Sequence, residues 1–441
     1  MNKDLKHTTL TLFPSAICNL NCTYCNISKN QALIQIDKEL EDFFNNPDYV
    51  MKRIHKYFEP CALTRLETWG GEPFLHMDRL NKVLPQIIED YPYLTDFFSS
   101  TNFSFPTWLS QFFGLMKQFK SYPERRFNYT LQISCDGPTE INDLGRGQGT
   151  TEKCLNNFNA LVQLLGSKLP CNVNLIIVPK PTLNLETIYL LDTKEEIIEY
   201  YHFFEKNFLE PINKLNYNNV HAFTNTPNIG VPCPATLKDG KYFAKFVKNC
   251  TELNTESFKY FKYYTDIRPF SISSQGRQTL TFYSPRFGCG TGYSNIGLLP
   301  RDLVSVCNEG FVQMVEQYNQ LRLQDTQGTI EKKLIQTKEQ HHLCYSDEGY
   351  EKFEEQMCNF CYRTNTSILT NLCNQIILLA LSGQIEKQYA QQSEALHAAQ
   401  VLATEYFCLK DNYNITGSFA LIPVGLIRLL LNGALPYLEK N

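Results

Sequence analysis

The chain has no apolar run long enough to cross a membrane and no marked excess of charge of either sign. Its most apolar stretch, Phe419–Leu431, is interrupted by Pro423, Gly425 and Arg428. It is shorter than the roughly 20 residues that a membrane-spanning helix needs. The formal net charge of −4 over 441 residues leaves no electrostatic footprint for nucleic acid or for an anionic membrane. We therefore expect no transmembrane helix, no nucleic acid partner and no membrane partner.

The first residues, Met1–Phe13, also lack the apolar core of a secretory signal. Sixteen cysteines in a chain of this length therefore indicate reduced thiols in the cytoplasm rather than a disulfide framework. A hydrophobic content of 43% predicts a globular protein. Because the chain is longer than one ordinary core supports, we expect one large domain with appended modules.

Short β-rich runs alternate with segments of helical period, which is typical of repeated βα units around a parallel sheet. The expected strands are Thr8–Phe13, Ala62–Thr68, Leu94–Ser100, Phe127–Ser134, Asn172–Val178 and Asn219–Thr224. The expected helices are Lys38–Phe58, Leu80–Asp90, Thr107–Phe119, Thr151–Leu165 and Lys194–Phe208. Six such units make a partial (βα)6 barrel of the α/β class, in which ligands collect at the carboxyl ends of the strands.

Three cysteines lie on the loop that follows the first expected strand. They are Cys18, Cys22 and Cys25. Thiolates are soft ligands that suit iron–sulfur clusters, and three of them leave one iron of a four-iron cluster open, as in a reactive metal site. A structural zinc knuckle, or a chance group of buried thiols, is the alternative for the triplet taken alone.

This Cx3CxxC pattern, with Tyr24 before its last cysteine, resembles the radical S-adenosylmethionine (SAM) superfamily. The resemblance implies a [4Fe–4S] cluster whose open iron chelates the amino and carboxylate groups of SAM, with Tyr24 beside the cofactor. It implies that an electron from the cluster breaks the sulfonium bond and leaves a 5'-deoxyadenosyl radical, and that a flavodoxin- or ferredoxin-type partner donates the electron. In such a site the cofactor does the chemistry and the protein aims it.

A glycine-rich motif follows the second expected strand, at Trp69-Gly70-Gly71-Glu72-Pro73. Two glycines let the backbone approach a ligand closely, and Glu72 or a nearby carbonyl can accept hydrogen bonds from an ammonium group. The motif matches the segment that binds the SAM amino group in the superfamily. An isolated copy would be an ordinary turn.

Polar motifs follow the third and fourth expected strands as well. Thr101-Asn102 resembles the family's Thr-Asn-Gly, but Phe103 replaces the glycine, so only a contact by Asn102 is carried over. Ser134-Cys135-Asp136-Gly137-Pro138, with Arg146 downstream, resembles the peptide- and protein-modifying branch. The resemblance implies that Ser134 and Arg146 hold the carboxylate or ribose of SAM, and a planar guanidinium suits a carboxylate. The alternative is a type I turn with a solvated arginine.

A second set of cysteines resembles the auxiliary-cluster domains called SPASM, or the shorter twitch domains, over residues 286–376. A glycine-rich hairpin is expected between Cys289 and Cys307, and further cysteines follow at Cys344, Cys358, Cys361 and Cys373. The resemblance implies at least one auxiliary [4Fe–4S] cluster held by Cys289, Cys307 and members of the last three, with Cys344 in a second cluster or as a spare ligand. A zinc site with the same ligands is the structural alternative.

The expected domain organisation has four parts: a partial barrel at 1–225, a linker with a helical insertion at 226–285, a small α+β auxiliary domain at 286–376, and a helical segment at 377–441. In the linker, Phe258–Tyr264 favours a helix with a buried aromatic face over stacking on bases. Only seventeen residues precede Cys18, so we expect no leader-binding module there. A leader peptide would then be recognised by the linker, the C-terminal region or a separate leader-binding protein.

These motifs predict a cytoplasmic radical SAM oxidoreductase that modifies a ribosomally made peptide or a protein side chain, for example by an oxidative crosslink. One alternative is a small-molecule dehydrogenase of natural-product or sugar biosynthesis, and another is a non-enzymatic iron–sulfur or zinc module. An anaerobic sulfatase-maturing enzyme is disfavoured, because Asn308 stands where those enzymes carry an aspartate base. An amide cannot take up a proton in that way. The sequence indicates no general base.

Overall fold

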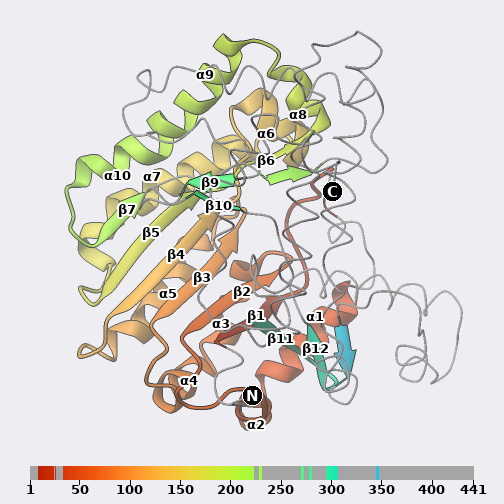
Figure 1. Cartoon of the computed structure of the whole chain (residues 1–441), viewed down its shortest axis with the longest axis vertical. Coiled ribbons are helices and arrows are strands. Elements are labelled where there is room, and N and C mark those ends of the chain that lie inside the picture. Colours follow the sequence, from red (N-terminus) through yellow and green to blue (C-terminus); the bar gives the residue numbers. More distant parts are fainter. Residues whose placement is uncertain are drawn as a thin grey trace, which may run out of the picture. The chain divides into compact units, whose positions relative to one another are not determined.

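The computed structural model describes residues 8–23, 25, 33–222, 228–230, 270–272, 278–280, 295–305 and 344–346. Its main feature is a nine-stranded sheet of order β13-β12-β11-β1-β2-β3-β4-β5-β7 (Figure 1). The strands are β1 (Thr9–Ser15), β2 (Arg65–Gly70), β3 (Asp96–Thr101), β4 (Phe127–Ile133), β5 (Val173–Pro179), β7 (Val220–Ala222), β11 (Asn295–Leu299), β12 (Leu303–Ser305) and β13 (Cys344–Ser346). The run from β11 to β7 is parallel, which confirms the α/β class and all six expected strands.

The chain divides into two compact units, and this sheet belongs to the one made of residues 1–181, 204–225 and 291–357. Its helical segments are α1 (Leu33–Phe44), α2 (Pro47–Tyr57), η1 (Pro73–Leu75), α3 (Met77–Leu80), α4 (Leu84–Asp90), α5 (Trp108–Lys120), α6 (Thr139–Arg146), α7 (Thr150–Lys168), the π-helical η2 (Glu205–Leu209) and α10 (Glu210–Leu215). None of the helices in the described part of the chain is long and apolar enough to cross a membrane.

The second unit has short described elements. They are β6 (Thr182–Asn184), α8 (Leu185–Leu190), α9 (Lys194–Phe204), β8 (Asn228–Gly230), β9 (Phe270–Ile272) and β10 (Gln278–Leu280). The last residue of α9, Phe204, is counted with the first unit. Strands β6 and β8 pair in parallel, whereas β9 and β10 pair antiparallel. The expected helix at Phe258–Tyr264 and the expected C-terminal helices at 377–441 lie outside the described residues.

One expected helix, Lys38–Phe58, is wrong as a single element. The structure has two helices there, because Pro47 has no backbone N–H to continue the first one and restricts the residue before it. Asn46 caps the second helix, its side-chain oxygen accepting a hydrogen bond from Tyr49 N at 3.2 Å. Proline at the first helical position is well tolerated, so the same residue ends one helix and starts the next.

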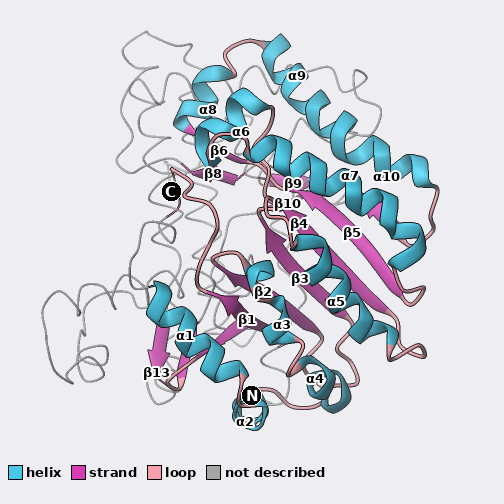
Figure 2. Ribbon diagram, turned by 180° about the vertical axis from the view of Figure 1, so that it is seen from behind, coloured by secondary structure: helices cyan, strands magenta, loops and turns pink. Residues whose placement is uncertain are grey.

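Strand β4 shows how the two faces of the sheet differ. Its alternate residues from Phe127 to Ile133 are buried, and the residues between them are exposed or half-exposed. The buried face lies under helices α5 and α7, as Figure 2 shows, and Phe112 of α5 contacts Tyr129 with ring centroids 5.9 Å apart. The opposite face, here called the inner face, carries polar side chains such as Gln132, which donates a hydrogen bond to Ser100 Oγ at 3.1 Å. Parallel strands are usually apolar on both faces, so a polar inner face suits a binding surface.

Strands β11 and β12 form the hairpin expected between Cys289 and Cys307, for which residues 295–305 are described. Strand β11 also pairs in parallel with β1, with Leu10 opposite Ile296. The side chain of Arg53 on α2 holds the hairpin by donating to Leu299 O at 3.0 Å and to Leu303 O at 3.1 Å. The hairpin is therefore part of the same sheet as the loop-bearing strand β1.

Candidate functional site

The first residues beyond strands β2 to β5 form one row at the carboxyl edge of the sheet. Gly71 N donates to Ser15 O at 3.0 Å, Ser134 N to Thr101 O at 2.8 Å, and Lys180 N to Ile133 O at 2.8 Å. Asn102 is the corresponding residue after β3, and the register pairs Thr101 with Ile133 and Ile133 with Pro179. The sequence therefore indicated three of these four positions, Gly71, Asn102 and Ser134. It missed Lys180, which no motif in the neighbouring residues marks.

The cysteine loop starts directly after β1, at the same edge. Cys18 and Cys25 are half-buried and Cys22 is 7% exposed. Cys18 Sγ accepts hydrogen bonds from Leu20 N at 3.4 Å and from Asn102 Nδ2 at 3.5 Å. Thr23 N donates to Gly145 O at 2.8 Å, so the loop is tied to the end of α6 as well as to β3. Tyr24 lies outside the described residues.

Burial is the largest influence on the pKa values of the Cys18 and Cys22 thiols. It raises the pKa of the Cys18 thiol to about 12, with the Glu72 carboxylate adding to the effect. Burial also raises the pKa of Cys22, although the nearby Arg146 opposes it. Cys18 is therefore a neutral thiol at physiological pH in the protein alone. A coordinated metal deprotonates a thiol outright, so ligation here would release protons.

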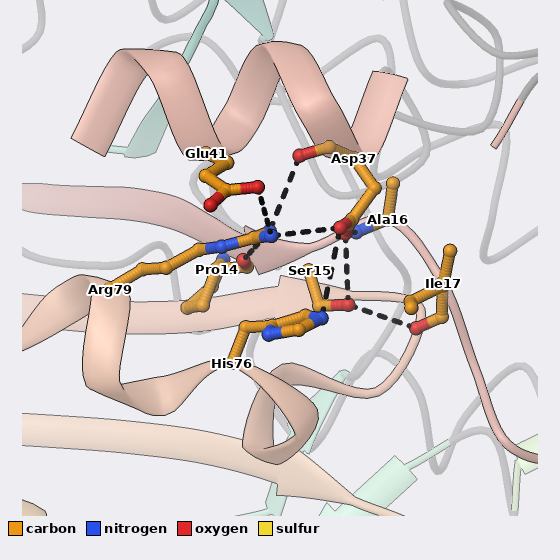
Figure 3. Close-up of polar contacts among 8 residues, drawn as sticks. All are labelled: Pro14, Ser15, Ala16, Ile17, Asp37, Glu41, His76 and Arg79. Carbon is orange, nitrogen blue, oxygen red and sulfur yellow. Dashed lines mark hydrogen bonds and ion pairs between the residues drawn. The ribbon is translucent and has the colours of Figure 1, made fainter. Parts of the chain in front are cut away.

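A buried cluster of polar side chains, drawn in Figure 3, holds the start of the cysteine loop. Asp37 on α1 accepts a hydrogen bond from Ala16 N at 2.9 Å and one from Ser15 Oγ at 3.2 Å. Arg79 on α3 donates to Asp37 Oδ2 at 2.9 Å and to Pro14 O at 3.0 Å. Two helices thus fix the backbone just before Cys18.

Arg79 lies between two carboxylates in this cluster, with its Nη2 2.9 Å from Asp37 Oδ2 and 3.6 Å from Glu41 Oε2. Burial alone would raise the pKa of Asp37, but the hydrogen bonds from Arg79 and Ala16 N outweigh it and hold the pKa below its ordinary value. His76 Nε2 lies 3.7 Å from Asp37 Oδ2, and burial, aided by the Arg79 charge, lowers the pKa of His76. Asp37 is therefore ionised at neutral pH and paired with a cation.

The two glycines after β2 are required by close backbone packing. A Cβ on Gly70 would meet Ser15 O at 2.2 Å, and one on Gly71 would meet Ile17 O at 2.3 Å. Gly70 also has φ +129°, a conformation that other residues rarely adopt. The motif therefore lies directly against the cysteine loop, and Glu72 N donates to Ile17 O at 2.8 Å.

Glu72 is buried, with 1% of its surface exposed, and its carboxylate accepts three internal hydrogen bonds. The donors are Asn102 N at 2.6 Å, Thr101 Oγ1 at 2.8 Å and Phe74 N at 3.1 Å. Burial nevertheless raises the pKa of Glu72 to about 7. Glu72 thus joins the ends of β2 and β3 in this structure.

Asn102 connects the end of β3 to the cysteine loop. Its Nδ2 donates to Asn19 Oδ1 at 2.8 Å as well as to Cys18 Sγ, and its Oδ1 accepts from Ser104 Oγ at 2.8 Å. Asn19 Nδ2 in turn donates to Ser104 Oγ at 2.9 Å. The amide group therefore supports Cys18 from the side of β3.

Arg146 is not the solvated arginine of the turn alternative. It is 8% exposed and donates from Nε to Asp136 Oδ2 and from Nη2 to Asp136 Oδ1, both at 2.8 Å. Ser134, by contrast, is half-exposed and its Oγ lies 3.5 Å from Ser100 Oγ. The sequence missed the Asp136–Arg146 pair, because the pairing depends on how the turn and helix α6 bring the two residues together and on their burial.

The chemistry of this donor set fits an iron–sulfur cluster. It combines three thiols on one loop with two N–H donors to Cys18 Sγ, and such N–H donors tune clusters through their sulfurs. Within the described residues, no three His, Cys, Asp or Glu side chains converge to hold one metal ion. A four-iron cluster differs from a single ion, because its thiolates stand apart by the width of the cluster.

The expected ligands of the auxiliary clusters fall in a part of the chain of which the structure describes only short segments. Cys289, Cys307, Cys358, Cys361 and Cys373 lie outside the described residues, as does Asn308, and Cys344 is described only as the first residue of β13. The sequence also predicts that Cys135, Cys154 and Cys171 are small apolar fillers of the barrel. Cys135 and Cys154 are buried, but Cys171 is exposed on the turn before β5, so the prediction is wrong for Cys171.

No protein-family model matches the chain, and no curated protein matches its sequence. Among solved structures, it is similar to anSMEcpe with bound AdoMet, at 18% identity and a TM-score of 0.39 over 68% of this chain and 75% of that chain. Its similarity to anSMEcpe with bound AdoMet and Cp18Cys peptide has 19% identity and a TM-score of 0.37, over 68% and 74%. Similarity at this level assigns no activity, which has to follow from the residues of the site.

Proposed function

We propose that the chain is a radical SAM enzyme, in which Cys18, Cys22 and Cys25 hold a [4Fe–4S] cluster that binds SAM. The observation that supports this most is the position of the three thiols on one braced loop at the carboxyl edge of a parallel sheet. The edge also carries the glycine pair and the polar row of Asn102 and Ser134. Ligands of parallel α/β sheets bind at this edge.

The residues of the chain have separate tasks in this proposal. A cluster held by the three cysteines and reduced by an external electron donor would supply the electron for cleavage of the sulfonium bond of SAM. The Asp37–Arg79 pair fixes the loop before Cys18, and Asn102 donates a hydrogen bond to the Cys18 sulfur. Gly70 and Gly71 allow the backbone of β2 to approach the loop, and the polar inner face offers groups that can form hydrogen bonds with a substrate.

The test is anaerobic reconstitution with iron and sulfide, followed by iron counting and electron paramagnetic resonance. The expected result is about four irons that depend on these three cysteines, in addition to the iron held by residues 286–376, and 5'-deoxyadenosine when SAM and dithionite are added. The variant Cys18→Ala/Cys22→Ala/Cys25→Ala should lose both, while the matched variant Cys61→Ala/Cys171→Ala, in two exposed cysteines, should keep both. Reconstituted protein that binds no cluster, or that forms no 5'-deoxyadenosine, would rule the proposal out.

The substrate is proposed to be a peptide or protein side chain. Support comes from the resemblance of Ser134–Pro138 and Arg146 to the peptide- and protein-modifying branch.

We propose in addition that the cysteines of residues 286–376 hold at least one auxiliary [4Fe–4S] cluster, which would accept an electron in a net oxidation. Incubation with candidate peptides should give products lighter by two hydrogens in mass spectrometry. A small-molecule product, or formylglycine in a sulfatase peptide, would identify one of the rival functions instead.

A further inference from the structure

Helix α6 ends against the cysteine loop. Thr23 N, in the residue that follows Cys22, donates to Gly145 O at 2.8 Å. Gly145 is followed by Arg146, the last residue of the helix. Cys22 is 7% exposed and Arg146 is 8% exposed. The hydrogen bond therefore ties the loop of the three thiols to a segment that carries a buried cation, where little water is present to screen the charge.

The position of this cation is fixed by its neighbours. Both oxygens of Asp136 accept hydrogen bonds from the Arg146 guanidinium at 2.8 Å, and Asp136 is 1% exposed. The backbone N–H of Asp136 donates to Asn142 Oδ1 at 2.9 Å. Asn142 Nδ2 in turn donates to Thr150 Oγ1 at 3.0 Å and to Thr151 Oγ1 at 2.9 Å. The ion pair is thus attached to the first turn of α7, and the guanidinium has a preorganised place.

The pair is neutral as a unit, but its positive end acts more strongly on the cysteine loop. Burial raises the pKa of Cys22. Of the charges around that thiol Arg146 has the largest effect, which lowers the pKa, and Asp136 raises it by less. Arg146 also opposes the burial that raises the pKa of Glu72. The net potential that the pair exerts at Cys22 is therefore positive.

We propose that Arg146, oriented by Asp136, raises the reduction potential of the cluster that Cys18, Cys22 and Cys25 hold. The three thiolates make the site negative, and reduction adds one electron from an external donor without breaking a bond. A fixed positive charge beside Cys22 therefore stabilises the reduced form more than the oxidised form, since charge and the surrounding polar groups set the potentials of iron–sulfur clusters. This inference rests on the proposed function, because it needs the cluster on this loop.

The test is a redox titration of the reconstituted protein without SAM, followed by electron paramagnetic resonance. The relevant cluster gives the signal that Cys18→Ala/Cys22→Ala/Cys25→Ala lacks. Arg146→Gln removes the positive charge and should lower the midpoint potential of that signal, whereas Asp136→Asn leaves Arg146 uncompensated and should raise it. The expected change in the ratio of reduced to oxidised cluster at a fixed potential is about tenfold in each case, which corresponds to about 59 mV for one electron.

The opposite signs separate the effect of charge from that of structure, because both variants break the same ion pair. Arg146→Lys loses the two-pronged geometry but keeps the charge, so its potential should stay closer to that of the wild type than the potential of Arg146→Gln does. This comparison decides the inference if Asp136→Asn, with its uncompensated buried cation, fails to fold. The control is Arg126→Gln, which removes an exposed arginine at the opposite end of β4 and should change no potential.

Three results would contradict the inference. Shifts of the same sign in Arg146→Gln and Asp136→Asn, or equal potentials for Arg146→Lys and Arg146→Gln, would show a structural role for the pair and overturn it. Unchanged potentials, with weaker binding of SAM to Arg146→Gln, would overturn it in favour of Arg146 as a ligand of SAM. Wild-type protein without a cluster that depends on the three cysteines would instead overturn the proposed function, and this inference with it.

Discussion

Phe103 carries a backbone conformation that normally belongs to glycine. Its φ is +58°, yet its ring is fully buried and lies 3.8 Å from the Trp108 ring, centroid to centroid. The left-handed conformation costs a residue with a Cβ about 1–2 kcal/mol, whereas removing a buried Phe costs about 3–5 kcal/mol. Packing therefore outweighs strain at this position, which explains how the backbone accommodates a phenylalanine there.

The balance between packing and backbone strain at Phe103 predicts an unusual order of stability for two variants. Phe103→Ala and Phe103→Gly should both destabilise the protein by several kcal/mol, but the glycine variant should be the more stable by about 1 kcal/mol, because it alone is relieved of strain. Urea unfolding measures the free energy of unfolding of both variants. At Phe112 in helix α5 the same pair should show the ordinary order, with alanine better by about 1 kcal/mol. The same order at both positions would show that the φ of Phe103 is not strained.

Glu72 predicts a pH dependence of stability. Its pKa in the folded protein is about 7, against 4.5 for the ordinary group, so between these values the folded state binds more protons than the unfolded state. The contribution of Glu72 is therefore complete below about pH 4.5 and is lost as the pH rises through 7, by up to about 3 kcal/mol. The free energy of unfolding of the wild type should fall across this window relative to Glu72→Gln. The exposed Glu140→Gln should run parallel to the wild type, and a parallel Glu72→Gln curve would mean that Glu72 is ionised throughout.

At the level of single residues, the sequence could predict which side chains follow each strand but not how they pair. Cys18, Gly71, Asn102 and Ser134 reach one edge because parallel strands end together, and this needs no coordinates. The partners of Glu72 and Arg146 depend on register and burial, which one sequence does not display. Lys180 was missed for the same reason, since nothing in its neighbouring residues marks it.

At the level of elements, hydrophobic periodicity predicted the six parallel strands of the barrel to within a few residues at each end. The break inside Lys38–Phe58 was missed because the apolar period continues across Pro47, although the proline itself is a helix-start signal. The pairing of β11 with β1 could not be predicted, because it joins segments that are far apart in the sequence. Local patterns contain no information on such contacts.

Helices α1 and α3 hold the start of the cysteine loop through Asp37 and Arg79. We therefore predict that this ion pair contributes to the free energy of unfolding of the protein. Asp37→Ala should lower the free energy of unfolding by about 3–5 kcal/mol, since it leaves the buried Arg79 with only the exposed Glu41 carboxylate, 3.6 Å away, as an ion-pair partner. Asp37→Asn keeps the one oxygen that accepts from Ala16 N and Ser15 Oγ and should cost less. Urea unfolding of the protein before reconstitution provides the measurement, and the exposed Asp78→Asn on α3 is the control. A loss for Asp37→Ala as small as that for Asp78→Asn would show that the pair does not brace the loop.

At the scale of the whole chain, strand β1 depends on residues almost 300 positions later. Its pairing with β11 places Leu10 opposite Ile296 and Thr11 opposite Gly297, and Thr11 Oγ1 donates to Asn295 Oδ1 at 2.8 Å. A truncated chain that ends at residue 225 would leave this edge of β1 unpaired, and an exposed strand edge promotes aggregation. We expect such a chain to aggregate in size-exclusion chromatography and to lose hydrogen-exchange protection in Thr9–Thr11. A chain that ends at residue 357 keeps β11, β12 and β13 and should retain that protection. If the shorter chain stays monomeric with β1 equally protected, the barrel is stable without its distant strands.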